Sequence, residues 1–189
     1  MNLETRLRST AIRYLSSPGF SAGARKRARL KRRLSGRSPE IHYFHQVDDP
    51  YSHLAVQKLD ALRSAYPLPI HVHLCAQPGA DYLGNSERFD SWALRDAASI
   101  ASGYGLRFPA APTQPSADLA RAANNALAAL LGSDGFAAAA TEIGELIWSG
   151  IKPDEPSAAG SSGDGQSAVE AGNALRQKLG HYAGAMFYY

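Results

Sequence analysis

The chain has 189 residues, and 44% of them are hydrophobic, enough for one folded core. No apolar run reaches the roughly 18 residues that span a bilayer, and the single cysteine excludes both an intramolecular disulfide and a CxxC redox pair. The net charge of +3 is uneven, because residues 38–189 hold 9 Lys and Arg against 16 Asp and Glu. This acidic body argues against a specific nucleic-acid substrate, and the scarcity of cysteine fits the cytoplasm.

The N-terminal residues 1–37 carry the opposite charge, with 11 Lys and Arg against one acid. Eight basic residues fall between Arg25 and Arg37, and no apolar h-region of a secretory signal precedes them. We interpret residues 1–37 as a basic arm, partly helical or disordered. A contact with anionic lipid or nucleic acid, or an organelle-targeting role, are the alternatives.

The body begins near Glu40 with a strand, a helix and a second strand. Residues 41–47 are rich in strand-forming side chains, and residues 50–66 show helical spacing of their leucines. Residues 67–76 alternate between aliphatic side chains and a second set that includes two histidines. The short connections predict a right-handed βαβ unit with parallel strands.

A helical segment follows over about residues 87–150, with breaks rich in glycine and proline. Residues 152–167 are typical of a flexible linker. The next helix ends at Gly180, a predicted C-cap, and residues 181–189 begin a strand.

The histidines of the second strand raise one further alternative. His71 and His73 lie two residues apart, so they share a face, and Cys75 continues it. Histidine and cysteine side chains are common ligands of metal ions. A packed or solvated face explains them more simply, and we predict no metal site.

The turn "DPYS", residues 49–52, has two interpretations. Asp is a preferred N-cap, and Pro is preferred at the first helical position, so the turn is explained without any function. A turn that carries a strand into a helix N-terminus is also where many α/β proteins hold their catalytic groups. The local sequence leaves both interpretations open.

Four fragments in the right order resemble the DsbA-like branch of the thioredoxin fold, nearest to 2-hydroxychromene-2-carboxylate isomerases and kappa-class glutathione transferases. The fragments are "DPYSHLA" (49–55), "WALRDAASIASGYGLRFP" (92–109), "IWSGIKPD" (147–154) and "NALRQKLGHYAGAMFYY" (173–189). The resemblance covers residues 40–189. It implies an α/β fold with a thioredoxin-like core and an inserted all-helical subdomain.

The resemblance also implies a function and a site. The expected activity is that of a glutathione-dependent isomerase or transferase, an oxidoreductase relative acting on a small aromatic or chromene-type substrate. A homodimer is left open. The implied catalytic residues are Asp49 and Ser52, and the implied residues that bind substrate or glutathione are Pro50, Tyr51, His53, Ala185 and Met186.

The chain departs from the family at three points, and the first two favour an alternative, whereas the retained residues Pro50, Tyr51 and Ser52 favour the enzyme. Asp49 stands where the family has a serine near the glutathione sulfur, and a carboxylate there disfavours a thiolate. Ala185 stands where thioredoxin-like proteins have a cis-proline, and a trans bond is expected there. The family's final strand and helix are absent, which suggests a truncated chain. The alternative is a non-catalytic thioredoxin-like binding module with a degenerate active site.

Overall fold

The computed structural model describes residues 23, 26, 36, 38–79, 86–154 and 164–189. Contacts divide the chain into two units, Met1–Pro39 and Glu40–Tyr189. Most of the predicted basic arm therefore lies outside the described residues, as do residues 155–163 of the predicted linker. The last three residues of that linker belong instead to a helix, which begins at Gly165.

Three strands form a mixed sheet in the second unit. Strand β1 (Ile41–His45) lies in the centre, β2 (Ile70–Leu74) pairs with it in parallel, and β3 (Met186–Tyr188) pairs with it antiparallel. The parallel pairing confirms the predicted βαβ unit. Together with the six helices of the described residues, the sheet makes the domain mixed α/β.

The crossover between β1 and β2 holds two helices where one was predicted. Helix α3 (Pro50–Val56) ends at Gln57, and α4 (Leu59–Ala65) begins after Lys58. The Gln57 amide donates to the backbone carbonyl of Arg107 (2.8 Å) and accepts from its N–H (2.8 Å). Gln57, which lies between the two helices, thus anchors a loop that is distant in the sequence. The spacing of the apolar residues does not predict this contact.

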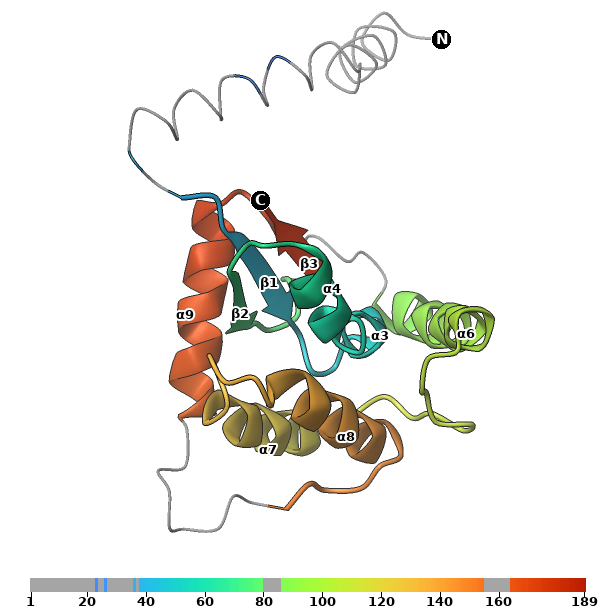
Figure 1. The fold of residues 1–189 in the computed structure, drawn as a ribbon. Helices are drawn as coiled ribbons and strands as arrows, with labels where there is room; N and C mark the ends of the chain where they lie inside the picture. Colours follow the sequence, from blue (N-terminus) through green and yellow to red (C-terminus); the bar gives the residue numbers. More distant parts are fainter. Residues whose placement is uncertain (1–22, 24–25, 27–35, 37, 80–85, 155–163) are drawn as a thin grey trace, which may run out of the picture. The chain divides into compact units, whose positions relative to one another are not determined.

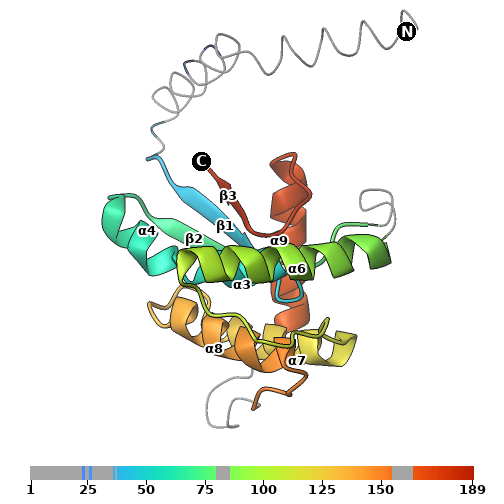
Figure 2. The same cartoon turned by 90° about the vertical axis from the view of Figure 1, so that its right-hand side faces the viewer.

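The predicted helical segment consists of three helices and is followed by a fourth. Their bounds are α6 (Ser86–Tyr104), α7 (Ala117–Ala128), α8 (Phe136–Trp148) and α9 (Gly165–Lys178). Figure 2 shows α6 passing across α3, with α7 and α8 together beneath them. Gly180 follows the end of α9 with φ of +75°, the left-handed conformation expected of a residue just beyond a helix.

Helices cover both faces of the sheet. On one face, Tyr43 and Leu74 pack with Leu59 and with Trp148 of α8 in the main core, all 0% exposed. On the other face α9 lies along β2, close to the His73 side chain (Figure 1). No helix in the described part of the chain is long and apolar enough to cross a membrane.

Candidate functional site

Asp49 is the N-cap of α3. Its Oδ2 accepts from the backbone N–H of Ser52 at 2.9 Å, and Pro50 occupies the first helical position. These are the features expected of a cap, because an N-terminal N–H has no partner within the helix. The cap interpretation of the "DPYS" turn is confirmed.

The Ser52 hydroxyl is the centre of a buried junction. It donates to Asp49 Oδ2 (2.8 Å) and accepts from the backbone N–H groups of Gln46 (3.2 Å) and Ala185 (2.8 Å). Ser52 is 0% exposed. A hydroxyl has one hydrogen and two acceptor positions, so all three are occupied. The hydroxyl joins the end of β1, the start of α3 and the segment before β3, and none of its capacity remains for a substrate.

Replacing Ser52 with alanine should destabilise the domain by about 3 kcal/mol, because two backbone N–H groups lose a buried acceptor. Ser64→Ala is the matched control, since its hydroxyl donates only to the Asp60 carbonyl on an exposed helix face. We expect that control to change stability by no more than about 0.5 kcal/mol. Urea unfolding followed by circular dichroism measures both. Equal urea midpoints for the two variants would contradict the stabilising role of the Ser52 hydroxyl.

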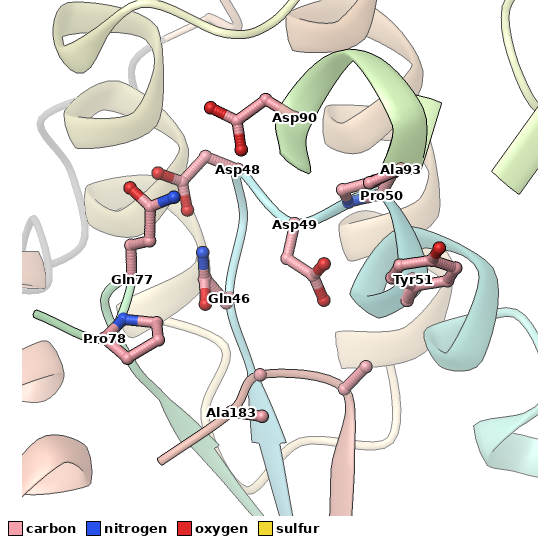
Figure 3. A pocket seen from close by; sticks show the side chains of 12 residues that line it. Gln46, Asp48, Asp49, Pro50, Tyr51, Gln77, Pro78, Asp90, Ala93 and Ala183 are labelled. Carbon is pink, nitrogen blue, oxygen red and sulfur yellow. The ribbon is translucent and has the colours of Figure 1, made fainter. Parts of the chain in front are cut away.

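A pocket of about 130 Å³ opens beside this turn. It lies between the turn, the segment before β3, residues 77–78 after β2 and the first half of α6 (Figure 3). Its lining residues are Gln46, Asp48, Asp49, Pro50, Tyr51, Gln77, Pro78, Asp90, Ala93, Ala183, Gly184 and Ala185. We call it the acidic pocket, because the carboxyl groups of Asp48, Asp49 and Asp90 are part of its lining.

Burial raises the pKa of the three carboxyl groups in the acidic pocket. For Asp49 the hydrogen bonds from Ser52 act in the opposite direction. Asp48 and Asp90 lie side by side at one edge, and Asp49 points into the space opposite Ala183 (Figure 3). No Lys, Arg or His of the described residues lines the pocket. It therefore disfavours an anion and accepts neutral or cationic groups.

Tyr51 lines the pocket but its hydroxyl is engaged elsewhere. The hydroxyl donates to Asp96 Oδ2 at 2.7 Å, which ties α3 to α6. Burial and this hydrogen bond both raise the pKa of Tyr51 above its usual 10.0. The phenol stays protonated at neutral pH, so Tyr51 contributes a ring wall and a fixed hydroxyl.

His53 lies in the core, outside the acidic pocket. It is 2% exposed, its Nε2 is 3.1 Å from the Arg107 carbonyl, and its Nδ1 has no hydrogen-bond partner in the described part of the chain. Gly144 of α8 faces the ring so closely that a Cβ there would meet Nδ1 at 2.2 Å. Burial lowers the pKa of His53 to about 4. The geometry gives His53 a packing role as a neutral ring.

The segment before β3 faces the turn through Gly184 and Ala185. A Cβ on Gly184 would come within 2.8 Å of the Gln46 Cβ, so glycine permits the close approach. Ala185 has φ of +52°, and the described residues contain no cis peptide bond, so its bond is trans as expected. Ala185 lines the pocket. Met186, the other residue implied here, begins β3 and does not line it.

Asp48, Asp90 and Gln46 belong to the pocket and were not among the predicted site residues. Asp48 directly precedes the predicted Asp49, so proximity in sequence was the available signal. Asp90 comes from α6, and nothing in the sequence connects it with the turn. Of the predicted site residues, the acidic pocket is lined by Asp49, Pro50, Tyr51 and Ala185. His53 and Met186 lie outside this pocket.

The histidines of β2 form a separate cluster. His73 Nε2 is 3.0 Å from His42 Nδ1, and Glu40 pairs with both His42 (3.4 Å) and His71 (3.3 Å). Within the described ranges no group of three such side chains is placed to hold a metal ion. Cys75 is 1% exposed, and burial raises its pKa to about 12. A buried thiol that resists ionisation is a poor nucleophile.

No protein-family model matches the chain. A search of curated proteins likewise finds no match. Any function must therefore be argued from the geometry of the acidic pocket.

Proposed function

We propose that residues 40–189 are a thioredoxin-like domain of the DsbA type that works as a non-catalytic binding module. The strand order β2–β1–β3, with β3 antiparallel to the other two, is compatible with such a core. The "DPYS" turn follows the first strand, and the helical segment separates the second strand from the third. This order supports the resemblance read from the sequence.

The Ser52 junction is the observation that carries the proposal. In the family that the chain resembles, the first serine of this turn lies near the sulfur of glutathione, and Asp49 stands at that position here. Here the Ser52 hydroxyl is fully buried and holds three parts of the fold together. Asp49 completes the junction and occupies the positive end of the α3 dipole that would favour a thiolate. The turn has become a structural anchor.

The charge of the acidic pocket indicates what the module binds. Glutathione brings two carboxylates against one ammonium group and, when activated, a thiolate as well, so its net charge is negative, and the pocket offers it three aspartates and no described cation. A like charge nearby raises the pKa of a thiol and opposes binding. A guanidinium or ammonium group gains from the same carboxylates, and the lining residues Pro50 and Ala93 offer an apolar surface to its alkyl stem. We therefore assign the pocket a basic side chain of a partner protein as its ligand.

Two small probes test this assignment on the full chain. N-acetyl-arginine amide and its uncharged citrulline counterpart are titrated while backbone amide signals are followed by NMR. We expect saturable shifts at Gln46, Asp49 and Ala185 with the arginine probe, and weaker shifts with the citrulline probe. Shifts of equal size for the two probes, or none for either, would overturn the assignment.

A pair of variants separates the pocket from the overall negative charge. Asp90→Asn removes a carboxylate from the pocket and keeps the shape of the side chain. Asp134→Asn makes the same change in an exposed turn outside the pocket. We expect Asp90→Asn to weaken binding of the arginine probe about fivefold, as for loss of one partly exposed charge partner. Asp134→Asn should leave it unchanged.

A further inference from the structure

A second cavity shares Gln77 and Pro78 with the acidic pocket and has the opposite chemistry. It has a volume of about 330 Å³ and lies between the loop after β2 and the C-terminal half of α9. Its other lining residues include Arg176, Asn173, Gln177 and His181. No acidic side chain of the described residues lines it. We call it the arginine cavity.

Arg176 is buried without a counter-charge among the residues that the structure describes. It is 6% exposed, and its Nη2 donates to the Ala76 carbonyl (2.9 Å) and to Asn173 Oδ1 (3.0 Å). Both acceptors are neutral. Its Nη1 is buried and has no hydrogen-bond partner, and no ion pair joins Arg176 to an acid of the described residues. An arginine stays charged in proteins, so the fold here holds an incompletely satisfied cation.

A buried guanidinium group lowers the stability of the fold unless an opposite charge pairs with it. A buried charge is normally matched by an opposite charge, and leaving it unmatched costs several kcal/mol. Two hydrogen bonds to neutral oxygens satisfy one nitrogen and leave the charge uncompensated. The neighbouring amides of Asn173 and Gln177 can supply further donors to an anion. A cavity beside an unpaired guanidinium has the composition of an oxyanion site.

We propose that the arginine cavity binds a small oxyanion, with the Arg176 guanidinium as its counter-charge. The planar fork of arginine matches the two oxygens of a carboxylate or phosphate. The proposal does not rest on the acidic pocket, although the two cavities share Gln77 and Pro78, because Arg176 lies on α9 and lines only the arginine cavity. A result that refutes the ligand proposed for the acidic pocket therefore does not refute the oxyanion site, and the reverse also holds.

Calorimetric titration of the full chain with inorganic phosphate and with acetate, at constant ionic strength in chloride, tests the site. We expect saturable binding of at least one anion, and the tighter of the two identifies the phosphate or carboxylate class. Arg176→Gln should weaken it by about tenfold or more, the effect of losing a charge-assisted hydrogen bond. Lys178→Gln removes the same charge from an exposed position of α9 and should bind as the unaltered chain does.

Thermal unfolding of an Arg176→Met variant distinguishes loss of the anion site from loss of the folded state. Replacing a poorly paired buried charge with an apolar side chain is often neutral or stabilising, so this variant should fold in chloride buffer. The anion that binds should raise the melting temperature of the unaltered chain and of Lys178→Gln, and it should not raise that of Arg176→Met. An equal rise in all three proteins, or no anion-specific rise in any, would overturn the oxyanion site.

Discussion

Replacing Gly172 with alanine should destabilise the domain by at least about 4 kcal/mol, among the largest effects that a single substitution produces. Gly172 lies in α9 where the helix packs on β2, and a Cβ there would stand 1.8 Å from the Leu74 carbonyl oxygen. Because that neighbour is backbone, no side-chain rotation relieves the overlap. The helix must move away from the strand, and the hydrogen bonds of Asn173 and Arg176 to Ala76 are lost with it.

Gly103 provides the matched control for this substitution. It lies near the end of α6, and a Cβ there would meet nothing within 4 Å. Gly103→Ala should therefore be neutral or stabilise by up to about 1 kcal/mol through helix propensity. Urea unfolding of both variants gives the comparison. If Gly172→Ala unfolded at the midpoint of the unaltered chain, the described docking of α9 on β2 would be wrong.

Acidification should destabilise the domain strongly between pH 7 and pH 5. Burial lowers the pKa of His45 to about 3 and that of His53 to about 4, against 6.5 for an ordinary histidine. In this interval the unfolded chain binds protons that the folded chain does not, so stability is complete above pH 6.5 and is lost as pH falls. Each histidine contributes a loss of about 2 kcal/mol by pH 5.

The aspartates of the acidic pocket act in the opposite sense. Burial raises the pKa of Asp48 and Asp49 above the usual 3.8, so protonation of the folded state adds stability at the acid end of the range. The histidine effect begins at higher pH and should dominate from pH 7 to pH 5. Urea midpoints at pH 7.5, 6 and 5 measure the net slope.

A His45→Phe variant tests the assignment of this slope. The His45 ring lies edge-on to Phe136 and is 3% exposed, so phenylalanine keeps the ring and removes its titration. We expect the pH dependence of this variant to fall by between a third and a half, since His53 and the partly buried His73, whose pKa values burial lowers to about 4, both remain. An unchanged slope in His45→Phe would show that other groups carry the acid sensitivity.

Local signals in the sequence predicted much of this fold. Alternation along residues 70–74 and the capping pair Asp49–Pro50 gave the parallel βαβ unit and the start of α3, because each is set within a few residues. Helix propensity alone missed the division between α3 and α4. There the Gln57 side chain bonds to Arg107, a contact between residues far apart in the chain.

The candidate site was predicted less completely than the fold. The sequence located the turn and Ala185, but it could not show that the Ser52 hydroxyl joins them, since that depends on how β3 returns beside β1. For the same reason His53 looked accessible beside the turn, although its helix face lies against Gly144 of α8. Asp90 and Arg176 acquire their significance only from burial and neighbours, which single-sequence patterns do not contain.

Calorimetric titration of the full chain with reduced glutathione, beside an Asp49→Ser variant, tests most directly whether the "DPYS" turn is an anchor or a thiol site. Serine also caps a helix, so the variant keeps α3 and removes only the carboxylate. We expect no saturable binding of glutathione at the turn, so any heat from the unaltered chain should disappear with Arg176→Gln, and binding that appears only with Asp49→Ser would mean that Asp49 closes the site. Saturable one-to-one binding of glutathione to the unaltered chain, weakened by Asp90→Asn, would contradict the structural role assigned to the turn.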